Sequence, residues 1–268
     1  MDVVILAGGE TPVALAAHLG VSTPDARALI EIDGRACIAY LLDSLREVSG
    51  LETIAVVGGA STLAALETLA PDVLRVAAKT TLVENVLAGA SAVSSSQLLL
   101  CTCDIPLVTK ETWREFLRRA DEKKLEAAYS IVRRDTVEKQ FPGGKRTYAT
   151  LTEGTFTGGN AFLLPRAQLP ELKTVIEASY QARKNPLAIA RILGTGFVIK
   201  AVLKKLSILD LERKMSQVLR CRAGAVEMSD AAIAFDVDKP EDYELAQSTL
   251  ENISVGSISA STHQIKTP

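Results

Sequence analysis

Residues 3–9 read Val-Val-Ile-Leu-Ala-Gly-Gly, an apolar run that ends in two glycines. An apolar run of this length, bounded by turn residues, predicts a fully buried strand over residues 3–7. Glycine lets the main chain approach a ligand closely and present its N–H groups to anionic oxygens. The turn at Gly8 and Gly9 therefore predicts a nucleotide-phosphate site, with a plain tight turn as the alternative.

The pattern of this strand repeats along the chain. Short apolar runs alternate with helical periodicity, and Thr109 is expected to cap a helix over residues 112–125. Further strands are expected at 53–57, 98–103 and 127–132, and further helices at 36–48, 63–69 and 83–93. This βαβ alternation predicts an α/β fold built on a doubly wound, mostly parallel sheet.

The second half of the chain is less regular. We expect an excursion over the sheet at about 133–160, a strand at 161–164, a helical region at about 166–222, a last strand at 232–237 and a last helix at 241–250. Residues 1–250 would then form the folded domain. Ser, Thr and Gly dominate residues 251–268, which predicts a disordered polar tail.

Composition excludes several classes of function. The 30 basic residues nearly balance the 32 acidic ones, so no global field favours nucleic acid or anionic lipid. We find no stretch of about 18 apolar residues and no basic segment before the first strand, so export and membrane insertion are not expected. The expectation is a cytoplasmic protein with a small-molecule ligand.

The four cysteines do not have the spacing of a zinc site. Cys101 and Cys103 are separated by one residue, and Cys37 and Cys221 lie far from them. Buried reduced thiols are the expected state, and redox sensing is the alternative.

Asp104 follows the expected strand at 98–103, where ligands collect in open α/β sheets. Burying an unpaired carboxylate there is costly, so it calls for a cation. A divalent ion that bridges to nucleotide phosphates is the common solution. Alternatively, Asp104 caps the next helix.

Asp236 and Asp238 end another apolar run. We expect the alternation of a strand to direct the two carboxylates to different faces, so that a single one of them joins Asp104. Asp104 and one of these two carboxylates form the expected Mg²⁺ or Mn²⁺ pair, and the pattern leaves open whether Asp236 or Asp238 is the second ligand. Capping of the helix after Pro240 is the other interpretation of Asp238.

Two further features lie near the expected strand ends. The motif Gly158-Gly159-Asn160 suits a backbone that approaches a ligand, with an amide to hydrogen-bond it, and a plain loop is the alternative. Arg27 could hold a triphosphate near the diglycine turn, or it could be a solvated surface residue.

Taken in order, these segments resemble the nucleotidyltransferases of the molybdenum-cofactor guanylyl- and cytidylyltransferase-like type, the MobA-like NTP transferase superfamily. The resemblance spans residues 1 to about 250. It depends on five segments: Leu6 to Gly9, Arg27 to Ile38, Cys103 to Leu107, Gly158 to Asn160 and Asp236 to Tyr243.

The resemblance implies a Rossmann-like, three-layer α/β/α nucleotide-diphospho-sugar transferase fold with a mixed, mostly parallel sheet. It also implies transfer of NMP from an NTP to a small, usually phosphorylated acceptor, with release of pyrophosphate. Arg27 and Asp104 would be the catalytic residues, and Asp104 and Asp238 would hold the metal. The nucleotide would contact Leu6, Ala7, Gly8, Gly9, Arg27, Asn85 and Asp104, and the acceptor would contact Gly159, Asn160 and Arg146.

Two residues depart from the family pattern. Glu10 places a carboxylate where the triphosphate is expected, and Arg27 stands where relatives usually have a lysine. A nucleotide- or metabolite-binding sensor that has lost turnover is therefore the alternative function. An oxidoreductase is disfavoured, because Gly58 and Gly59 follow the second strand in place of the acidic residue that dinucleotide binding requires.

The basic residues around the excursion have two interpretations. Arg133, Arg134, Lys145 and Arg146 could bind an anionic acceptor, or they could form a solvated basic loop. The helical region at about 166–222 could serve a homo-oligomer contact, acceptor specificity or core packing.

Overall fold

The computed structural model describes residues 1–21, 27–144, 146–169 and 205–262, and the single positions 173, 196, 200 and 203, with side chains through residue 252. Its centre is one mixed sheet in the order β10-β7-β9-β6-β1-β4-β5, and a short strand, β8, pairs with β9. The strands are β1 Asp2–Ala7, β4 Ile54–Gly58, β5 Leu74–Ala77, β6 Gln97–Thr102, β7 Ala127–Arg133, β8 Ala149–Leu151, β9 Gly154–Pro165 and β10 Ala223–Met228.

Most strand pairs of this sheet are parallel. Strand β1 runs parallel to β4 and β6, β4 to β5, and β10 to β7, while β9 runs antiparallel between β6 and β7. A small antiparallel ribbon, β2 Glu31–Ile32 and β3 Arg35–Ala36, lies apart from the sheet. The parallel pairs bring the carboxyl ends of β1, β4 and β6 to one edge, where ligands bind in such sheets.

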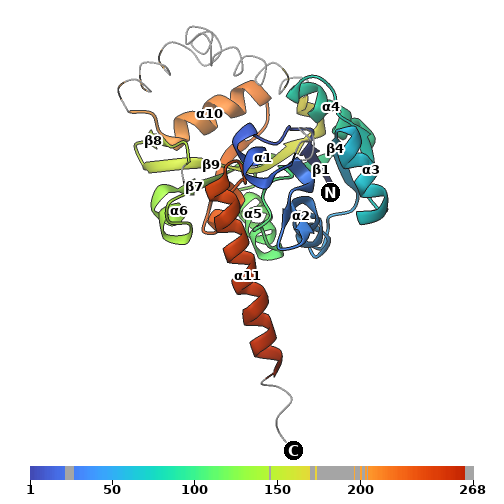
Figure 1. The fold of residues 1–268 in the computed structure, drawn as a ribbon. Coiled ribbons are helices and arrows are strands. Elements are labelled where there is room, and N and C mark those ends of the chain that lie inside the picture. The colour runs from blue at the N-terminus through green and yellow to red at the C-terminus, as the bar shows by residue number, and fades with distance from the viewer. Residues whose placement is uncertain are drawn as a thin grey trace, which may run out of the picture.

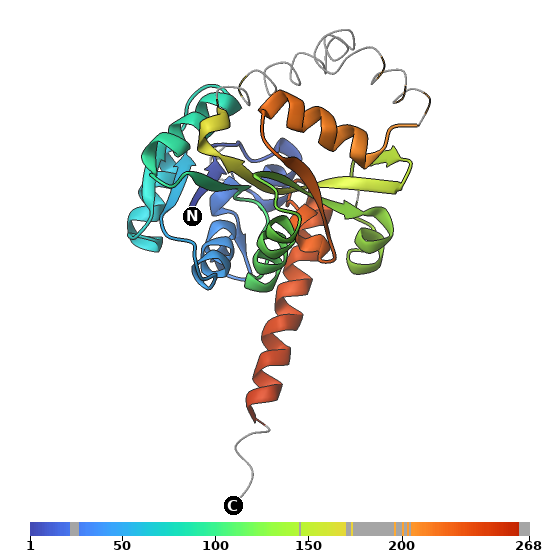
Figure 2. The same cartoon turned by 180° about the vertical axis from the view of Figure 1, so that it is seen from behind.

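Helices cover both faces of the sheet. They are α1 Val13–Leu19, α2 Cys37–Arg46, α3 Ala60–Leu69, α4 Leu82–Ala92, α5 Lys110–Glu122, α6 Arg134–Gln140, α10 Ile208–Leu219 and α11 Pro240–Thr262, with 3-10 turns η1 Arg27–Leu29, η2 Arg166–Gln168 and η3 Ala231–Ala234. Figures 1 and 2 show α2, α5 and α11 on one side of the sheet and α4 and α10 on the other. The arrangement is the expected three-layer α/β/α fold.

The hydrophobic core follows the two-residue period of β1. Val3 and Ile5 belong to the same core cluster as Leu41 of α2 and Trp113 of α5, whereas Val4 belongs to a separate cluster that includes Val86 of α4. Because successive side chains of a strand point to opposite faces, one apolar strand supports both helical layers.

Several elements begin and end where the sequence predicts. Helices α2, α4 and α5 lie within a few residues of the expected boundaries. Thr109 caps α5, since its hydroxyl accepts a hydrogen bond from the Thr112 N–H in a capping box. No helix within the described residues has the length and apolar character needed to span a membrane.

The prediction of a last strand at 232–237 is wrong. Residues 231–234 form η3, and the Asp230 side chain accepts a hydrogen bond from the Ala232 N–H at its start. The edge position beside β7 belongs to β10, at residues 223–228, which the sequence analysis did not identify. The apolar pattern of residues 231–235 reflects their burial in the core. A buried segment need not pair in the sheet, so this pattern alone does not identify a strand.

The expected excursion at about 133–160 is also more regular than predicted. It contains α6, β8 and the first half of β9. Helix α11 continues through Thr262, into the segment for which the sequence predicted disorder, and Figure 1 shows it projecting from the body. Much of the expected helical region at 166–222, and residues 263–268, lie outside the described residues.

Candidate functional site

A cluster of three carboxylates lies at the carboxyl end of β6. Asp104 follows this strand, and Asp236 and Asp238 come from the segment between η3 and α11. One ligand oxygen of each carboxylate lies within 4.8 Å of the other two. The Val237 N–H donates to the Asp104 carbonyl at 2.9 Å, which joins the two segments.

The expectation that a single residue of the Asp236 and Asp238 pair would join Asp104 is therefore wrong. Side chains two positions apart share a face of a strand, so the alternation of a strand would not have separated these two carboxylates. Residues 235–238 moreover form no strand. Both carboxylates lie close enough to Asp104 to share one cation with it.

Asp104 is buried, with 6% of its surface exposed. Its Oδ2 pairs with Arg27 Nη2 at 2.6 Å, and its Oδ1 has no hydrogen-bond partner among the described residues. Thr109 is the N-cap of α5, so the capping interpretation of Asp104 is wrong. A buried carboxylate oxygen without a partner is energetically costly, and a bound cation would remove that cost.

Arg27 lies between the carboxylates. Its Nη2 contacts both Asp104 and Asp238, and its side chain is largely buried. The interpretation of Arg27 as a solvated surface residue is therefore wrong. The guanidinium bridges the two residues expected to hold a metal, so a metal ion and Arg27 would compete for these two carboxylates.

The electrostatics of the cluster favour a cation. Burial raises the pKa of Asp236 above its usual value, and the neighbouring Asp104 charge raises it further, against the lowering effect of Arg146 and Arg27. Three carboxylate oxygens within reach of one another are the hard ligands that Mg²⁺ and Mn²⁺ prefer. The residues present fit such an ion.

The diglycine turn lies beside this cluster. Gly8 and Gly9 are exposed after β1, and a Cβ placed on Gly9 would lie 3.9 Å from Arg27 Cδ. Ala7 is fully buried within β1, and the Leu6 carbonyl accepts a hydrogen bond from the Cys103 N–H at 3.2 Å. Glu10 is exposed, so its carboxylate has access to solvent.

Asn85 of α4 approaches the same turn from the other side. Its Oδ1 accepts a hydrogen bond from the Lys79 N–H at 2.6 Å, and its Nδ2 lies 3.6 Å from a Cβ placed on Gly8. The capping box of Thr81 and Glu84 begins α4 one turn earlier and so orients Asn85. Its contact with a nucleotide stays a prediction.

The Gly158-Gly159-Asn160 motif lies inside β9, so the plain-loop interpretation is wrong. A Cβ on Gly159 would lie 2.3 Å from Ser130 Oγ, and one on Gly158 would overlap the Tyr129 hydroxyl. These glycines make room for side chains of β7. Asn160 Nδ2 donates to the Ile233 carbonyl at 3.3 Å, and its contact with an acceptor stays a prediction.

The basic residues around the excursion that the structure describes make contacts within the protein. Arg133 pairs with Glu227 and Arg134 with Glu138, and Lys145 lies outside the described residues. Arg146 is 7% exposed and makes hydrogen bonds to the segment that carries Asp236. The expected acceptor contact of Arg146 is therefore not supported, because its guanidinium is buried among protein groups.

The four cysteines are free and buried, as expected. Burial raises the pKa of all four thiols, which disfavours the reactive thiolate and with it the redox-sensing alternative.

The role of Asp242 was not predicted from the sequence. Its carboxylate accepts hydrogen bonds from the Asp238 and Lys239 N–H groups at the start of α11. Asp242 thus accepts from the two amides that precede Pro240, while the capping interpretation of Asp238 stays a prediction. An acidic residue two positions after Pro240 in the first helical turn is the signal that could have identified Asp242.

Comparison with known proteins places these residues in a family context. Residues 3–191 match the MobA-like NTP transferase domain. A search of the curated proteins finds no significant match.

Among solved structures, a hypothetical transferase from Thermus thermophilus is 34% identical, with a TM-score of 0.75, over 90% of this chain and 98% of the other. A nucleotidyl transferase from Methanothermobacter has 18% identity and a TM-score of 0.58 over 94% of this chain and 98% of its own. The 2-C-methyl-D-erythritol 4-phosphate cytidylyltransferase of Thermus thermophilus has 17% identity and a TM-score of 0.51 over 92% and 98%. The last two show likeness of fold, which is the expected Rossmann-like one.

Proposed function

Because this chain belongs to the MobA-like NTP transferase family, we propose that it transfers NMP from an NTP to a small, phosphorylated acceptor. The observation that carries the proposal is the cluster of Asp104, Asp236 and Asp238 beside the diglycine turn, with a buried Asp104 oxygen that has no partner among the described residues. This cluster can hold a divalent cation at the place where a triphosphate would meet the backbone of Gly8 and Gly9.

In the proposed reaction, an acceptor oxygen forms a bond to the α-phosphorus of the NTP. The bond from that phosphorus to the oxygen bridging to the β-phosphate breaks, and pyrophosphate leaves with the electron pair. An ionised phosphate acceptor carries its own nucleophilic oxygen, so no general base is needed. Catalysis then depends on in-line positioning and on neutralising charge.

The residues of the site have distinct roles in this proposal. Asp104, Asp236 and Asp238 would hold Mg²⁺ or Mn²⁺, which supplies charge neutralisation for the phosphates when bound. The backbone of Gly8 and Gly9 would receive the triphosphate. Arg27, whose Cδ lies 3.9 Å from a Cβ placed on Gly9, would move its guanidinium from the carboxylates to the phosphate oxygens.

A second candidate is a nucleotide-binding sensor without turnover. The observation that favours it is the contact of the Arg27 guanidinium with both Asp104 and Asp238, the two expected metal ligands. If Arg27 stays there in the complex with nucleotide, it takes the place of the catalytic cation.

A screen for pyrophosphate release tests the proposed function. The full-length protein is incubated with each NTP, Mg²⁺ and a panel of sugar, polyol and cofactor phosphates, and NTP binding is measured by calorimetry. We expect release with at least one pair. NTP binding without release from any pair supports the sensor, and absence of NTP binding contradicts both candidates.

Asp104→Asn tests the role of the cluster in the same assay. The substitution removes a charged ligand oxygen, so we expect turnover to fall by at least about 100-fold and Mn²⁺ binding to weaken. Asp121→Asn, on the exposed surface of α5, is the matched control and should behave as wild type. Unchanged turnover in Asp104→Asn would rule out the metal assignment.

A further inference from the structure

The segment that carries Asp236 and Asp238 belongs to no sheet, and side chains hold it in addition to the backbone hydrogen bond from Val237 to Asp104. Residues 235–238 form neither helix nor strand, although two of the three cluster carboxylates come from them. Carboxylates on an irregular segment can bind a cation tightly only if other contacts order that segment. Two described side chains make such contacts, Arg146 with the carbonyl groups of the segment and Asp242 with its N–H groups.

Arg146 holds the carbonyl groups of the segment. Its Nε donates to the Ala234 carbonyl at 3.0 Å and its Nη2 to the Asp236 carbonyl at 3.1 Å. The guanidinium also lies 4.8 Å from the centre of the Phe235 ring, in cation–π geometry. One planar side chain therefore fixes the backbone on both sides of Phe235.

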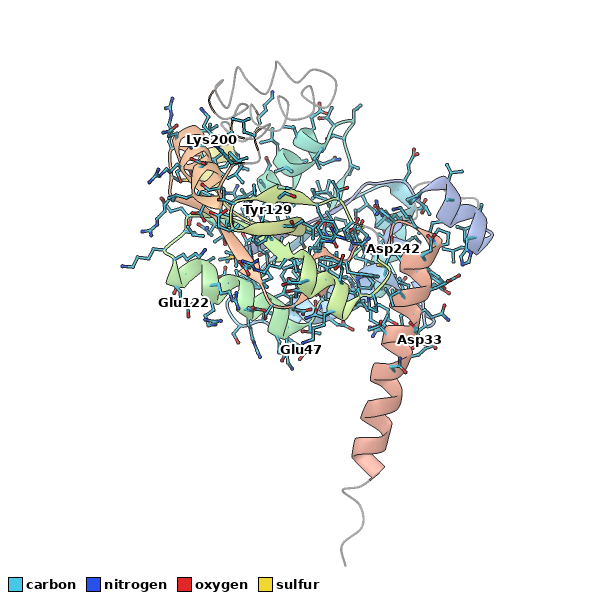
Figure 3. The ribbon with its side chains drawn as sticks, turned by 90° about the vertical axis from the view of Figure 1, so that its left-hand side faces the viewer. Asp33, Glu47, Glu122, Tyr129, Lys200 and Asp242 are labelled. Atoms are coloured by element: carbon cyan, nitrogen blue, oxygen red, sulfur yellow. The ribbon has the colours of Figure 1, made fainter. Side chains whose placement is uncertain are left out.

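Asp242 holds the N–H groups of the segment. Its Oδ2 accepts from the Asp238 N–H at 3.3 Å and from the Lys239 N–H at 3.2 Å, while its Oδ1 accepts from Arg146 Nη1 at 3.0 Å. The side chain is 4% exposed. Figure 3 shows Asp242 at the end of α11 that adjoins the body of the protein.

The charges of this pair leave the cluster available to a cation. Arg146 and Asp242 neutralise each other at 3.0 Å. Arg146 Nε lies 3.8 Å from Asp236 Oδ1, longer than its hydrogen bonds to the backbone carbonyls. Arg146 thus orders the main chain without forming a short ion pair with the Asp236 carboxylate.

We infer that Arg146 and Asp242 are positioning residues, which set Asp236 and Asp238 for binding a divalent cation. The inference rests on the proposed function, because it assigns a cation to the cluster. Neither residue is required to touch the cation or the nucleotide. They act through the backbone on either side of Asp238, as the hydrogen-bonded partners of metal ligands do in other sites.

The test is a Mn²⁺ titration, with Mn²⁺ alone, followed by electron paramagnetic resonance. It compares the full-length wild type with Arg146→Met, Arg146→Lys and Asp242→Asn, and it is repeated in an Arg27→Gln background, where the competing guanidinium is absent. We expect Arg146→Met to weaken Mn²⁺ binding by about 10- to 100-fold. Arg146→Lys keeps the charge without the planar fork, so we expect an intermediate loss.

Hydrogen exchange gives a second measurement that does not depend on the metal. In Asp242→Asn, we expect faster exchange at the amides of Asp238 and Lys239, whose acceptor is altered. Arg134→Met is the matched control, because Arg134 forms an exposed ion pair with Glu138 on α6. It should match the wild type in both measurements, and thermal melts confirm that each variant is folded.

The outcomes separate the inference from the proposed function. If folded Arg146→Met and Asp242→Asn bind Mn²⁺ as tightly as the wild type, the inference is overturned even where turnover is observed. If the wild type binds Mn²⁺ and the variants bind it weakly, the inference holds even where no NTP and acceptor pair reacts. A protein that fails to bind Mn²⁺ in the Arg27→Gln background overturns both.

Discussion

At the scale of single residues, Arg27 determines whether the carboxylates of the candidate site are paired with a guanidinium. Its Nη2 contacts Asp104 and Asp238, so a single guanidinium charge offsets part of the charge of these two carboxylates in the structure. Its Nε is buried without a hydrogen-bond partner among the described residues, which is costly unless a ligand satisfies it. We therefore expect Arg27 to move away from the carboxylates when an anionic ligand and a divalent cation bind.

Arg27→Gln tests this competition. Without the guanidinium, we expect the nucleotide-free protein to bind Mn²⁺ at least about tenfold more tightly, or ~1.4 kcal/mol. The same substitution should weaken NTP binding, because a phosphate partner is lost. Both effects are measured by calorimetry. Arg35→Gln, which removes an exposed partner of Asp43, is the control, and an unchanged Mn²⁺ affinity in Arg27→Gln would contradict the competition.

At the scale of elements, glycines set how closely chains pack around the site. Gly89 of α4 faces the sheet, and a Cβ there would lie 2.3 Å from Val4 Cγ1 and 2.8 Å from Val57 Cγ2. Helix α4 can rest on β1 and β4 only because this position has no side chain. The same helix carries Asn85, so its distance from the sheet also places Asn85 beside Gly8.

Gly89→Ala should therefore lower the stability of the protein. Alanine favours a helix by about 1 kcal/mol over glycine, but overpacking of a core typically costs about 1–3 kcal/mol, so we expect a net loss. Urea unfolding measures it. Ser91→Ala, on the exposed side of α4, is the control and should change stability by less than about 0.5 kcal/mol. A stabilised Gly89→Ala would show that α4 can move away from the sheet without cost.

At the same scale, strand β9 shows where local sequence patterns do not predict an element. Strand β9 extends from Gly154 to Pro165, but only residues 161–164 were predicted, because glycine and threonine before them are typical of loops. The space above Gly158 and Gly159 is filled by Tyr129 and Ser130 of β7. These neighbours come from about 30 positions earlier in the chain, and no local pattern could show that they lie there.

At the scale of the whole molecule, Asp2 joins segments that are distant in sequence. Its buried carboxylate accepts hydrogen bonds from the N–H groups of Ser95 at 2.7 Å, Ser94 at 2.8 Å and Thr53 at 3.2 Å. Burial alone would raise the pKa of Asp2, but these backbone donors lower it from 3.8 to about 2. Asp2 thus connects β1 to the loops that precede β6 and β4.

The contribution of Asp2 should depend on pH in a defined direction. The folded-state pKa lies below the unfolded one, so the ionised carboxylate stabilises the fold above about pH 4 and loses that effect as the pH falls toward 2. We expect Asp2→Asn to lower the free energy of unfolding at pH 7 by about 1–2 kcal/mol. Urea unfolding from pH 7 down to pH 3 measures both proteins.

The difference between wild type and Asp2→Asn should narrow toward pH 3. A difference that stays constant over this range would show that the charge of Asp2 is not the cause. Asp121→Asn, which removes an exposed carboxylate from α5, is the control and should leave stability within about 0.5 kcal/mol at each pH.

The sequence by itself determined the βαβ order of the first half, the diglycine turn, and Asp104 and Asp238 as acidic residues after apolar runs. These features are local, since strand length, helical period and turn residues are properties of neighbouring positions. Only the tertiary structure decided that Asp236 joins the cluster, that Arg27 bridges its carboxylates, and that Arg146 and Asp242 hold the segment between them. Those contacts join residues as much as 211 positions apart, and their energies exist only once the sheet has brought them together.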